Sequence, residues 1–289
     1  MKKQTSQLRE MLGSKEIVVA PGVYSAFPAI IAENVGFNAV YMSGYTTSAI
    51  LHGMPDLGLI TMTEMVLNAC RINEVVNIPI IADCDNGYGN ALNVIRSVKA
   101  YEKAGVAAIQ IEDQVFPKKC GHLDEKNIIK AEEMVGKIKA AQYAREDQNL
   151  LIIARTDART VVGFDEAVNR GNLYAQAGSD IVFIESPLSE EEMIKIPQLI
   201  KAPVMANMVE NGKTPILSNQ DLEDMGYSLV IWPDSTAFCT ARSITKTLEE
   251  LKVNKTTEGI INDEMITWDM FNKLVDAPKY MDLSKKFKS

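Results

Sequence analysis

The chain has 289 residues, of which 46% are hydrophobic and 24% charged, a composition typical of globular proteins. Its 30 basic and 38 acidic side chains give a net charge of −8, which argues against a nucleic-acid partner because such a partner needs a basic surface. The N-terminal stretch MKKQTSQLRE lacks the apolar segment of a signal peptide, and no apolar run approaches about 18 residues, so we expect a cytoplasmic protein without a membrane span.

Short apolar runs recur along the chain, each bounded by turn residues. They occupy 17–20, 39–43, 79–83, 107–112, 150–154, 180–185, 203–206 and 228–232. Their apolar residues are continuous rather than alternating, which indicates strands buried on both faces, as in parallel sheets. Amphipathic helical patterns lie between the runs, at 90–105, 130–146, 164–178 and 189–200.

Eight strand–helix units in a chain of this length predict a TIM-type (β/α)8 barrel. A doubly wound sheet is the alternative, and it normally carries a glycine-rich phosphate loop after its first strand. The equivalent turn here, PGVYSAF at 21–27, has one glycine, which favours the barrel. No linker divides the chain, so we expect one domain over 1–289, including a C-terminal helical extension from about 255. A helical pattern at 262–275 is too apolar for one face and predicts packing on a neighbouring subunit.

Polar residues follow nearly every predicted strand, at the rim where barrel enzymes hold their active sites. They are Ser43, Gly44, Tyr45, Asp83, Asp85, Glu112, Asp113, Arg155, Glu185, Asn207 and Glu210. A purely structural barrel does not require such a set, so the pattern predicts an active site at this rim.

Three of these acids, Asp83, Asp85 and Glu112, are expected to converge. Carboxylates that converge repel each other unless a cation lies between them. Oxygen ligands favour a hard cation, and Mg²⁺ is the cation most often held by one or two carboxylates and water. The alternative is that these acids cap helices or pair with Lys118 and Lys119.

Arg155 and the Ser43-Gly44-Tyr45 turn are candidates for binding an anion. The planar guanidinium of Arg155 suits a substrate carboxylate, although a structural ion pair with a rim carboxylate is the alternative. The turn could offer backbone N–H groups, but its polar side chains could equally cap the next helix.

Cys120 lies in the unusual segment FPKKCGH at 116–122. We expect Lys118 and Lys119 to lower the thiol pKa, because nearby positive charge favours the thiolate. The connection at 113–129 is longer than most between a strand and a helix and is typical of a lid. A buried loop cysteine without a role is the alternative.

These motifs also resemble those of a known family. KKCGH after IEDQVFP resembles the active-site loop of the isocitrate lyase/phosphoenolpyruvate mutase superfamily, and DCDNGYGN resembles its magnesium loop. YMSGY, ARTDA and ANMVENGKTP match in order, so the resemblance covers roughly 5–275. It implies a barrel with a C-terminal helix swapped between subunits, a homotetramer, and Mg²⁺ as cofactor, with Mn²⁺ as an open alternative.

The resemblance also implies roles for single residues. Asp83 and Asp85 would bind the metal, with Asp56 and Glu112 in support. Cys120 would be the general acid, and Tyr45 or a carboxylate of the metal loop would be the base. The expected substrate-binding residues are Ser43, Gly44, Tyr45, Gly121, His122, Arg155, Glu185 and Asn207.

The Cys-bearing loop marks the carbon–carbon lyases of this family, which act on small hydroxy acids. Leu123 and Asp124 replace an arginine and a proline of the 2-methylisocitrate lyase pattern, and Phe238 replaces a second arginine. A third substrate carboxylate would therefore lack a cation, so we expect a 2-hydroxy dicarboxylate, 2,3-dimethylmalate, cleaved to pyruvate and propionate. Alternatives are a 2-methylisocitrate lyase that yields pyruvate and succinate, a lyase or decarboxylase acting on 2-alkylmalates or oxaloacetate, and a non-enzymatic binding protein.

Overall fold

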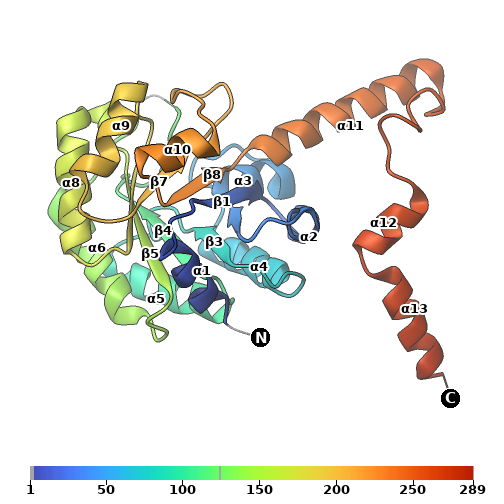
Figure 1. Cartoon of the computed structure of the whole chain (residues 1–289), viewed down its shortest axis with the longest axis horizontal. Coiled ribbons are helices and arrows are strands. Elements are labelled where there is room, and N and C mark those ends of the chain that lie inside the picture. Colours follow the sequence, from blue (N-terminus) through green and yellow to red (C-terminus); the bar gives the residue numbers. More distant parts are fainter. Residues whose placement is uncertain (1–2, 124, 289) are drawn as a thin grey trace. The chain divides into compact units, whose positions relative to one another are not determined.

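The computed structural model describes residues 3–123 and 125–288. Within them, eight parallel strands form a closed barrel in chain order (Figure 1). The strands are β1 (Val18–Val23), β2 (Val40–Met42), β3 (Ile80–Asp83), β4 (Ala108–Glu112), β5 (Leu151–Thr156), β6 (Ile181–Ile184), β7 (Val204–Asn207) and β8 (Leu229–Trp232). Pairing of β8 with β1 aligns Leu229 with Val18 and closes the barrel. The predicted strands and the TIM-type barrel are confirmed, and the doubly wound alternative is excluded.

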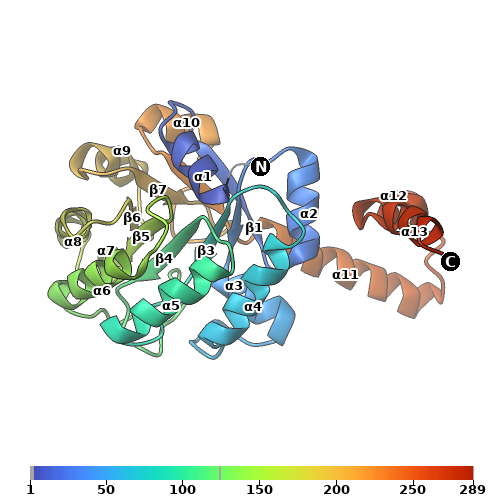
Figure 2. The same ribbon diagram turned by 90° about the horizontal axis from the view of Figure 1, so that it is seen from below.

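Helices surround the strands (Figure 2). They are α1 (Gln4–Leu12), α2 (Ala26–Val35), α3 (Gly44–His52), α4 (Met62–Asn73), α5 (Ala91–Lys103), α6 (Ala131–Ala144), α7 (Ala158–Val161), α8 (Phe164–Gln176), α9 (Glu190–Leu199) and α10 (Asn219–Met225). The four predicted helical patterns correspond to α5, α6, α8 and α9. Each helix is slightly shorter than its pattern because capping residues occupy the ends. Asn90, for example, accepts hydrogen bonds from the N–H groups of Leu92 and Asn93 at the start of α5.

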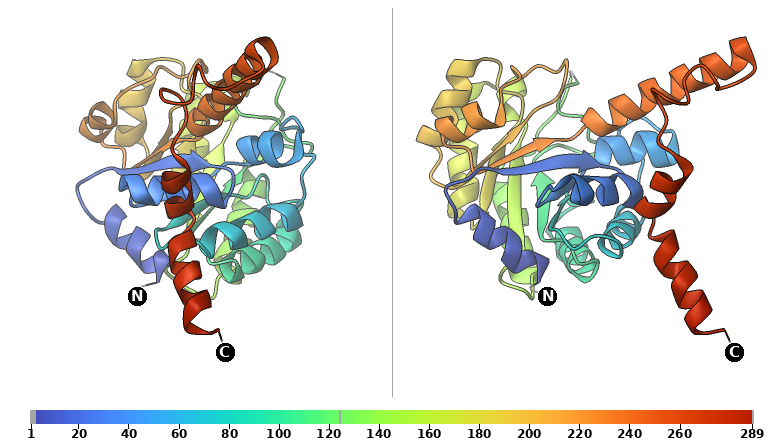
Figure 3. Two further views of the ribbon diagram at one scale, coloured as in Figure 1. Left: turned by 90° about the vertical axis from the view of Figure 1, so that its right-hand side faces the viewer. Right: turned by 45° about the vertical axis from the view of Figure 1, so that its right-hand side comes forward.

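The barrel is filled by apolar side chains from alternate positions of the strands. Figure 3 shows the strands enclosed by helices in two further views. Tyr41, Ile81, Ile153 and Phe183 belong to this buried cluster. Leu8 of α1 joins it beside residues at the start of strands, so α1 covers the N-terminal end of the barrel. The opposite end, where the strands finish, carries the predicted rim.

The chain divides into two compact units, and Thr236–Ser289 form the second. This unit contains most of α11 (Ser235–Asn254), then α12 (Trp268–Leu274) and α13 (Ala277–Lys286). The helix predicted at 262–275 is wrong in its first half, because α12 begins only at Trp268. Thr267 caps it by accepting a hydrogen bond from the N–H of Met270. The single-domain expectation for 1–289 stays a prediction. Across the described residues, no helix combines the length and apolar character needed to cross a membrane.

Candidate active site at the carboxyl end of the barrel

Most of the predicted rim residues converge on one pocket, whereas Asp113 pairs with Arg170 and Glu210 accepts a hydrogen bond from Ser235. Its walls include ten of the residues predicted from sequence, namely Ser43, Tyr45, Asp56, Asp83, Cys120, Gly121, His122, Arg155, Glu185 and Asn207. The other three contact residues of this pocket: Gly44 donates its N–H to Asp83, Asp85 pairs with Lys118, and Glu112 lies beside Arg155. The cavity measures about 40 Å³ because the loop carrying Cys120 and Gly121 reaches into it.

Lys118 lies inside the acidic cluster. Its ammonium is 2.5 Å from Asp56 Oδ1 and 2.6 Å from Asp85 Oδ1, and all three side chains are buried. Within the described part of the chain, the acids and histidines form no ready-made group of three or more metal ligands. Pairing with Lys118, the alternative considered from the sequence, is therefore what this conformation contains. Burial raises the pKa of Asp85 to about 7, although Lys118 acts in the opposite direction.

The chemistry of the cluster nevertheless fits a hard cation. Glu112 is buried, and its Oε1 has no hydrogen-bond partner within the described residues. Burial raises the pKa of Glu112 well above its usual range, although the positive charges of Arg155 and Lys118 act in the opposite direction. Asp83 accepts hydrogen bonds from the N–H groups of Gly44 and Asp85, which hold its carboxylate in the same cluster. Carboxylate oxygens of this kind are the ligands that Mg²⁺ prefers.

The Ser43-Gly44-Tyr45 turn begins α3. Ser43 caps the helix, since its Oγ accepts a hydrogen bond from the N–H of Thr46, and the Gly44 N–H is used by Asp83. In this conformation the turn therefore supports the helix and the acidic cluster. Burial, followed by the negative charges around it, raises the pKa of Tyr45, so its phenol stays protonated near neutral pH.

Arg155, the penultimate residue of β5, lies among three carboxylates. Its Nε and Nη2 donate to Asp157 at 2.9 and 3.0 Å. Glu112 Oε2 lies 3.4 Å from its Nη1, and Glu185 Oε2 lies 3.4 Å from its Nη2. Its guanidinium carbon also lies 5.4 Å from the centre of the Phe183 ring. The ion pair considered as an alternative is thus present, while the same side chain lines the pocket. Arg155 is fixed by Asp157 and aimed by it at the cavity.

The expectation that lysines lower the Cys120 pKa is wrong. Burial raises the pKa of this thiol to about 12, and the N–H of His122 offsets only part of the rise. The ammonium of Lys118 is engaged by Asp56 and Asp85, and that of Lys119 donates to the Glu125 carbonyl. Cys120 is therefore a protonated thiol at neutral pH, which suits a proton donor better than a nucleophile.

His122, Glu185 and Asn207 form a chain along one wall. His122 Nε2 lies 3.4 Å from Glu185 Oε1, and the Asn207 amide donates to Glu185 at 3.2 Å. His122 Nδ1 accepts the N–H of Lys213 at 3.0 Å, so its proton lies on Nε2, toward Glu185. Burial lowers the pKa of His122, which keeps the ring neutral. The three side chains thus supply polar contacts without adding a free positive charge.

The sequence reasoning missed Asp234. It lines the pocket, is 4% exposed, and its Oδ1 has no hydrogen-bond partner among the described residues. Burial, reinforced by Glu210 and Glu185, raises its pKa to about 7. The signal was available, because Asp234 follows the eighth strand as the other site residues follow theirs. Apolar groups complete the wall, contributed by Phe183, Val209, Ile231 and Pro233. Asp124 lies outside the described residues, and Leu123 is largely exposed.

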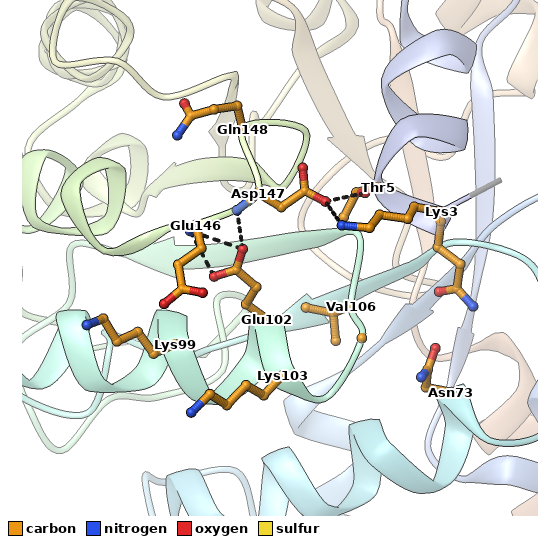
Figure 4. Close-up of a pocket in the computed structure, with 12 residues that line it drawn as sticks. Lys3, Thr5, Asn73, Lys99, Glu102, Lys103, Val106, Glu146, Asp147 and Gln148 are labelled. Atoms are coloured by element: carbon orange, nitrogen blue, oxygen red, sulfur yellow. Dashed lines mark hydrogen bonds and ion pairs between the residues drawn. The ribbon is translucent and has the colours of Figure 1, made fainter.

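A larger cavity, of about 630 Å³, lies between α1, α5 and the segment before β5 (Figure 4). Its charged groups serve local structure. Lys3 pairs with Asp147, and the Glu102 carboxylate accepts the backbone N–H groups of Glu146 and Asp147. We therefore assign the chemistry to the pocket at the strand ends.

Comparisons with known proteins agree on one family. Residues 8–252 match the family described as phosphoenolpyruvate phosphomutase. The chain is 49% identical to 2,3-dimethylmalate lyase of Eubacterium barkeri, over 98% of this chain and 97% of the relative. It is 46% identical to 2-methylisocitrate lyase of Aeropyrum pernix, over 94% of this chain and 87% of the relative.

Solved structures extend the agreement to three dimensions. A crystal structure of 2,3-dimethylmalate lyase, described as a PEP mutase/isocitrate lyase superfamily member, superposes with a TM-score of 0.92 at 34% identity, covering 99% of this chain and 95% of that one. Phosphonopyruvate hydrolase in complex with oxalate and Mg²⁺ gives a TM-score of 0.89 at 27% identity, covering 99% of each chain. The barrel, the site and the sequence identity lead to one conclusion: this chain belongs to the phosphoenolpyruvate mutase/isocitrate lyase superfamily.

Proposed function

We propose that the protein is a magnesium-dependent carbon–carbon lyase that cleaves the C2–C3 bond of 2,3-dimethylmalate to give pyruvate and propionate. The observation that carries this proposal is the protonated, buried thiol of Cys120 on a loop that reaches into a pocket of carboxylates and one arginine. The 49% identity to a 2,3-dimethylmalate lyase supports the same substrate.

The acidic cluster would hold the metal. Asp83 and Asp85 are the proposed ligands, directly or through water, and Asp56 and Glu112 support them. Bound there, a divalent cation would polarise the 2-hydroxyl and carboxylate of the substrate and stabilise the negative charge that develops on them. The relative solved with oxalate and Mg²⁺ supports this assignment, and Mn²⁺ is the alternative cation.

The side chains of the pocket would perform the remaining tasks. Arg155 and Asn207 would bind substrate oxygens, with Glu185 fixing both, and the Ser43–Tyr45 turn would face the pyruvate-like half. When the C2–C3 bond breaks, its electron pair stays on C3 of the propionate half. Cys120 would donate its proton to that carbon. The closed loop with Gly121 and His122 would exclude water from the carbanion. Of the two candidates for the base that accepts the hydroxyl proton, a carboxylate of the metal loop is favoured over Tyr45, because the Tyr45 phenol stays protonated near neutral pH.

The shape and charge of the pocket favour a dicarboxylate with methyl substituents. Phe183, Val209 and Ile231 offer apolar surface suited to methyl groups. The cations on the same walls are already paired, Lys118 with Asp56 and Asp85, and Arg155 with Asp157. A third carboxylate would meet Asp234 instead of a free cation, and burying an unpaired charge is costly.

The second candidate is 2-methylisocitrate lyase activity, which gives pyruvate and succinate. It is favoured by the 46% identity to the Aeropyrum pernix enzyme of that name. The two activities share the proposed cleavage chemistry and differ only in the third carboxylate.

A substrate panel separates these functions. The protein with Mg²⁺ is incubated with 2,3-dimethylmalate, 2-methylisocitrate, isocitrate, 2-methylmalate and oxaloacetate, and pyruvate, glyoxylate and oxalate are measured. We expect 2,3-dimethylmalate to have the highest kcat/KM and EDTA to abolish turnover. Faster turnover of 2-methylisocitrate would overturn the substrate assignment, and no turnover of any compound would favour a binding protein.

We also propose a homotetramer in which the C-terminal helix is exchanged between subunits. Large apolar side chains on α11 to α13 support this, since Leu248, Trp268 and Phe271 are exposed within a single chain. Light scattering should give a mass four times the 31.9 kDa of one chain. Truncation before α12 should lower that mass. A cytoplasmic location stays a prediction.

A further inference from the structure

Lys126 is a buried cation that the proposed reaction does not use. Its side chain is 1% exposed, and its Nζ lies 2.7 Å from Asp157 Oδ1. The same ammonium donates a hydrogen bond to the backbone carbonyl of Gly121. Burying a lysine is costly unless its charge is compensated, so both contacts are needed to account for its position.

The Gly121 carbonyl belongs to the peptide between Gly121 and His122, one residue after Cys120. Ser186 Oγ is also within hydrogen-bonding distance of this carbonyl, at 3.3 Å, and shares its single proton between it and Glu185 Oε1 at 3.1 Å. The loop backbone is pressed against the pocket here, because a Cβ added to Gly121 would lie 2.6 Å from Glu185 Cγ and would also collide with Arg155. The carbonyl is therefore held from one side by Lys126 and Ser186, while Gly121 itself rests on the site.

Asp157 is the fixed end of this connection. It follows β5, and its N–H donates to the buried Asp113 carboxylate at 2.9 Å. Its carboxylate receives both Arg155 and Lys126. Burial acts to raise the pKa of Asp157, but these two cations hold it at about 2, so the carboxylate stays ionised.

We propose that Lys126 is a positioning residue that sets the acid thiol of Cys120 relative to Arg155. Its ammonium connects the backbone carbonyl of Gly121, the residue after Cys120, to the Asp157 carboxylate that orients the Arg155 guanidinium. The positions of the Cys120 thiol and the Arg155 guanidinium, the two groups proposed to touch the substrate, thus both depend on Asp157. The inference rests on the proposed function for the roles of Cys120 and Arg155, but the connection itself is independent of the substrate.

The test measures how well Cys120 is protected. The full-length protein without substrate is treated with iodoacetamide, and labelling of each cysteine is followed by peptide mass spectrometry. Lys126→Met, which removes the ammonium, should raise the labelling rate of Cys120 by about tenfold or more, as expected for loss of a charged hydrogen bond. Lys130→Met, which removes an exposed lysine from the same region, should leave the rate unchanged.

Cys84, fully buried after β3, reports on the whole fold in the same sample. Its labelling should stay slow in Lys126→Met. If Cys120 labels at the wild-type rate while Cys84 stays slow, the proposal is overturned; acceleration of Cys84 in step with Cys120 means that the variant fails to fold. Should Lys126→Met fail to fold, Ser186→Ala decides, since loss of the second donor should also speed labelling of Cys120, and a wild-type rate there would overturn the proposal.

Activity gives a second reading. Because a displaced acid affects the chemical step, Lys126→Met should lower kcat for 2,3-dimethylmalate more than it changes KM. An increase in KM with an unchanged kcat would contradict a role in placing Cys120. Failure of the proposed function shows differently: the substrate panel would be negative for the wild-type protein while the labelling result still held.

Discussion

The replacement Cys120→Ser tests the proton donor most directly. Burial raises the pKa of the thiol to about 12, so at pH 7 only about one molecule in 10⁵ carries a thiolate. The group is therefore available as an acid in essentially every molecule. Serine keeps a similar size and a hydroxyl but is a far weaker acid than the thiol. General acid catalysis contributes about 10²- to 10⁴-fold, and we expect turnover of 2,3-dimethylmalate to fall by that factor.

Two measurements accompany the rate. Circular dichroism should show that Cys120→Ser keeps its fold and thermal midpoint, because the replacement is nearly isosteric. In the wild-type protein, iodoacetamide labelling of Cys120 should keep rising beyond pH 10, since only the thiolate reacts. Near-normal turnover of the serine variant would remove Cys120 from the acid role. A labelling plateau near pH 9 would refute the claim that burial keeps the thiol protonated.

Three further changes probe the metal, the specificity and the stability of the site. Asp85→Asn should weaken Mg²⁺ binding in calorimetry by at least about tenfold, because it removes one of the two carboxylates proposed to bind the metal directly or through water. Unchanged affinity would place the metal elsewhere. Asp234→Asn should raise kcat/KM for 2-methylisocitrate relative to 2,3-dimethylmalate, since it removes a carboxylate that opposes a third substrate charge; an unchanged ratio would contradict that role. Asp113→Ala should lower the free energy of unfolding by about 3–5 kcal/mol in urea titrations, because Arg170 would lose its buried partner at 3.0 Å; a loss below about 1 kcal/mol would mean that the region relaxes.

The barrel was predictable because its determinants are local and repeated. A strand buried on both faces needs a continuous apolar run, and β3 (Ile80–Asp83) and β5 (Leu151–Thr156) lie where such runs end in a polar residue. Once the barrel was inferred, its topology placed those polar residues on one rim. The convergence of Asp83 and Arg155 on a single pocket followed without knowledge of any side-chain position.

The pKa of Cys120 and the ion-pair partners of Lys118 could not be predicted from the residues adjacent in sequence. Lys118 and Lys119 adjoin Cys120 in sequence, yet burial and distant carboxylates determine the thiol pKa. Lys118 pairs with Asp56 because the loop folds back over that residue. The two residues are 62 positions apart in sequence, yet Lys118 Nζ lies 2.5 Å from Asp56 Oδ1. The start of the helix predicted at 262–275 was wrong for a related reason. The Thr267 side chain accepts a hydrogen bond from the N–H of Met270 and so starts the helix at a point where the apolar pattern already runs.

The charge balance of the closed pocket links the metal to the loop. The buried carboxylates of Asp56, Asp83, Asp85 and Glu112 are opposed by the ammonium of Lys118 and one edge of Arg155. An ammonium carries one positive charge and cannot satisfy four carboxylates. Burial raises the pKa of Glu112 despite Arg155 and Lys118, and its Oε1 has no partner within the described residues. We infer that a divalent cation and Lys118 compete for Asp85. Lys118→Met should therefore tighten Mg²⁺ binding in the absence of substrate, and weaker binding in that variant would refute the competition.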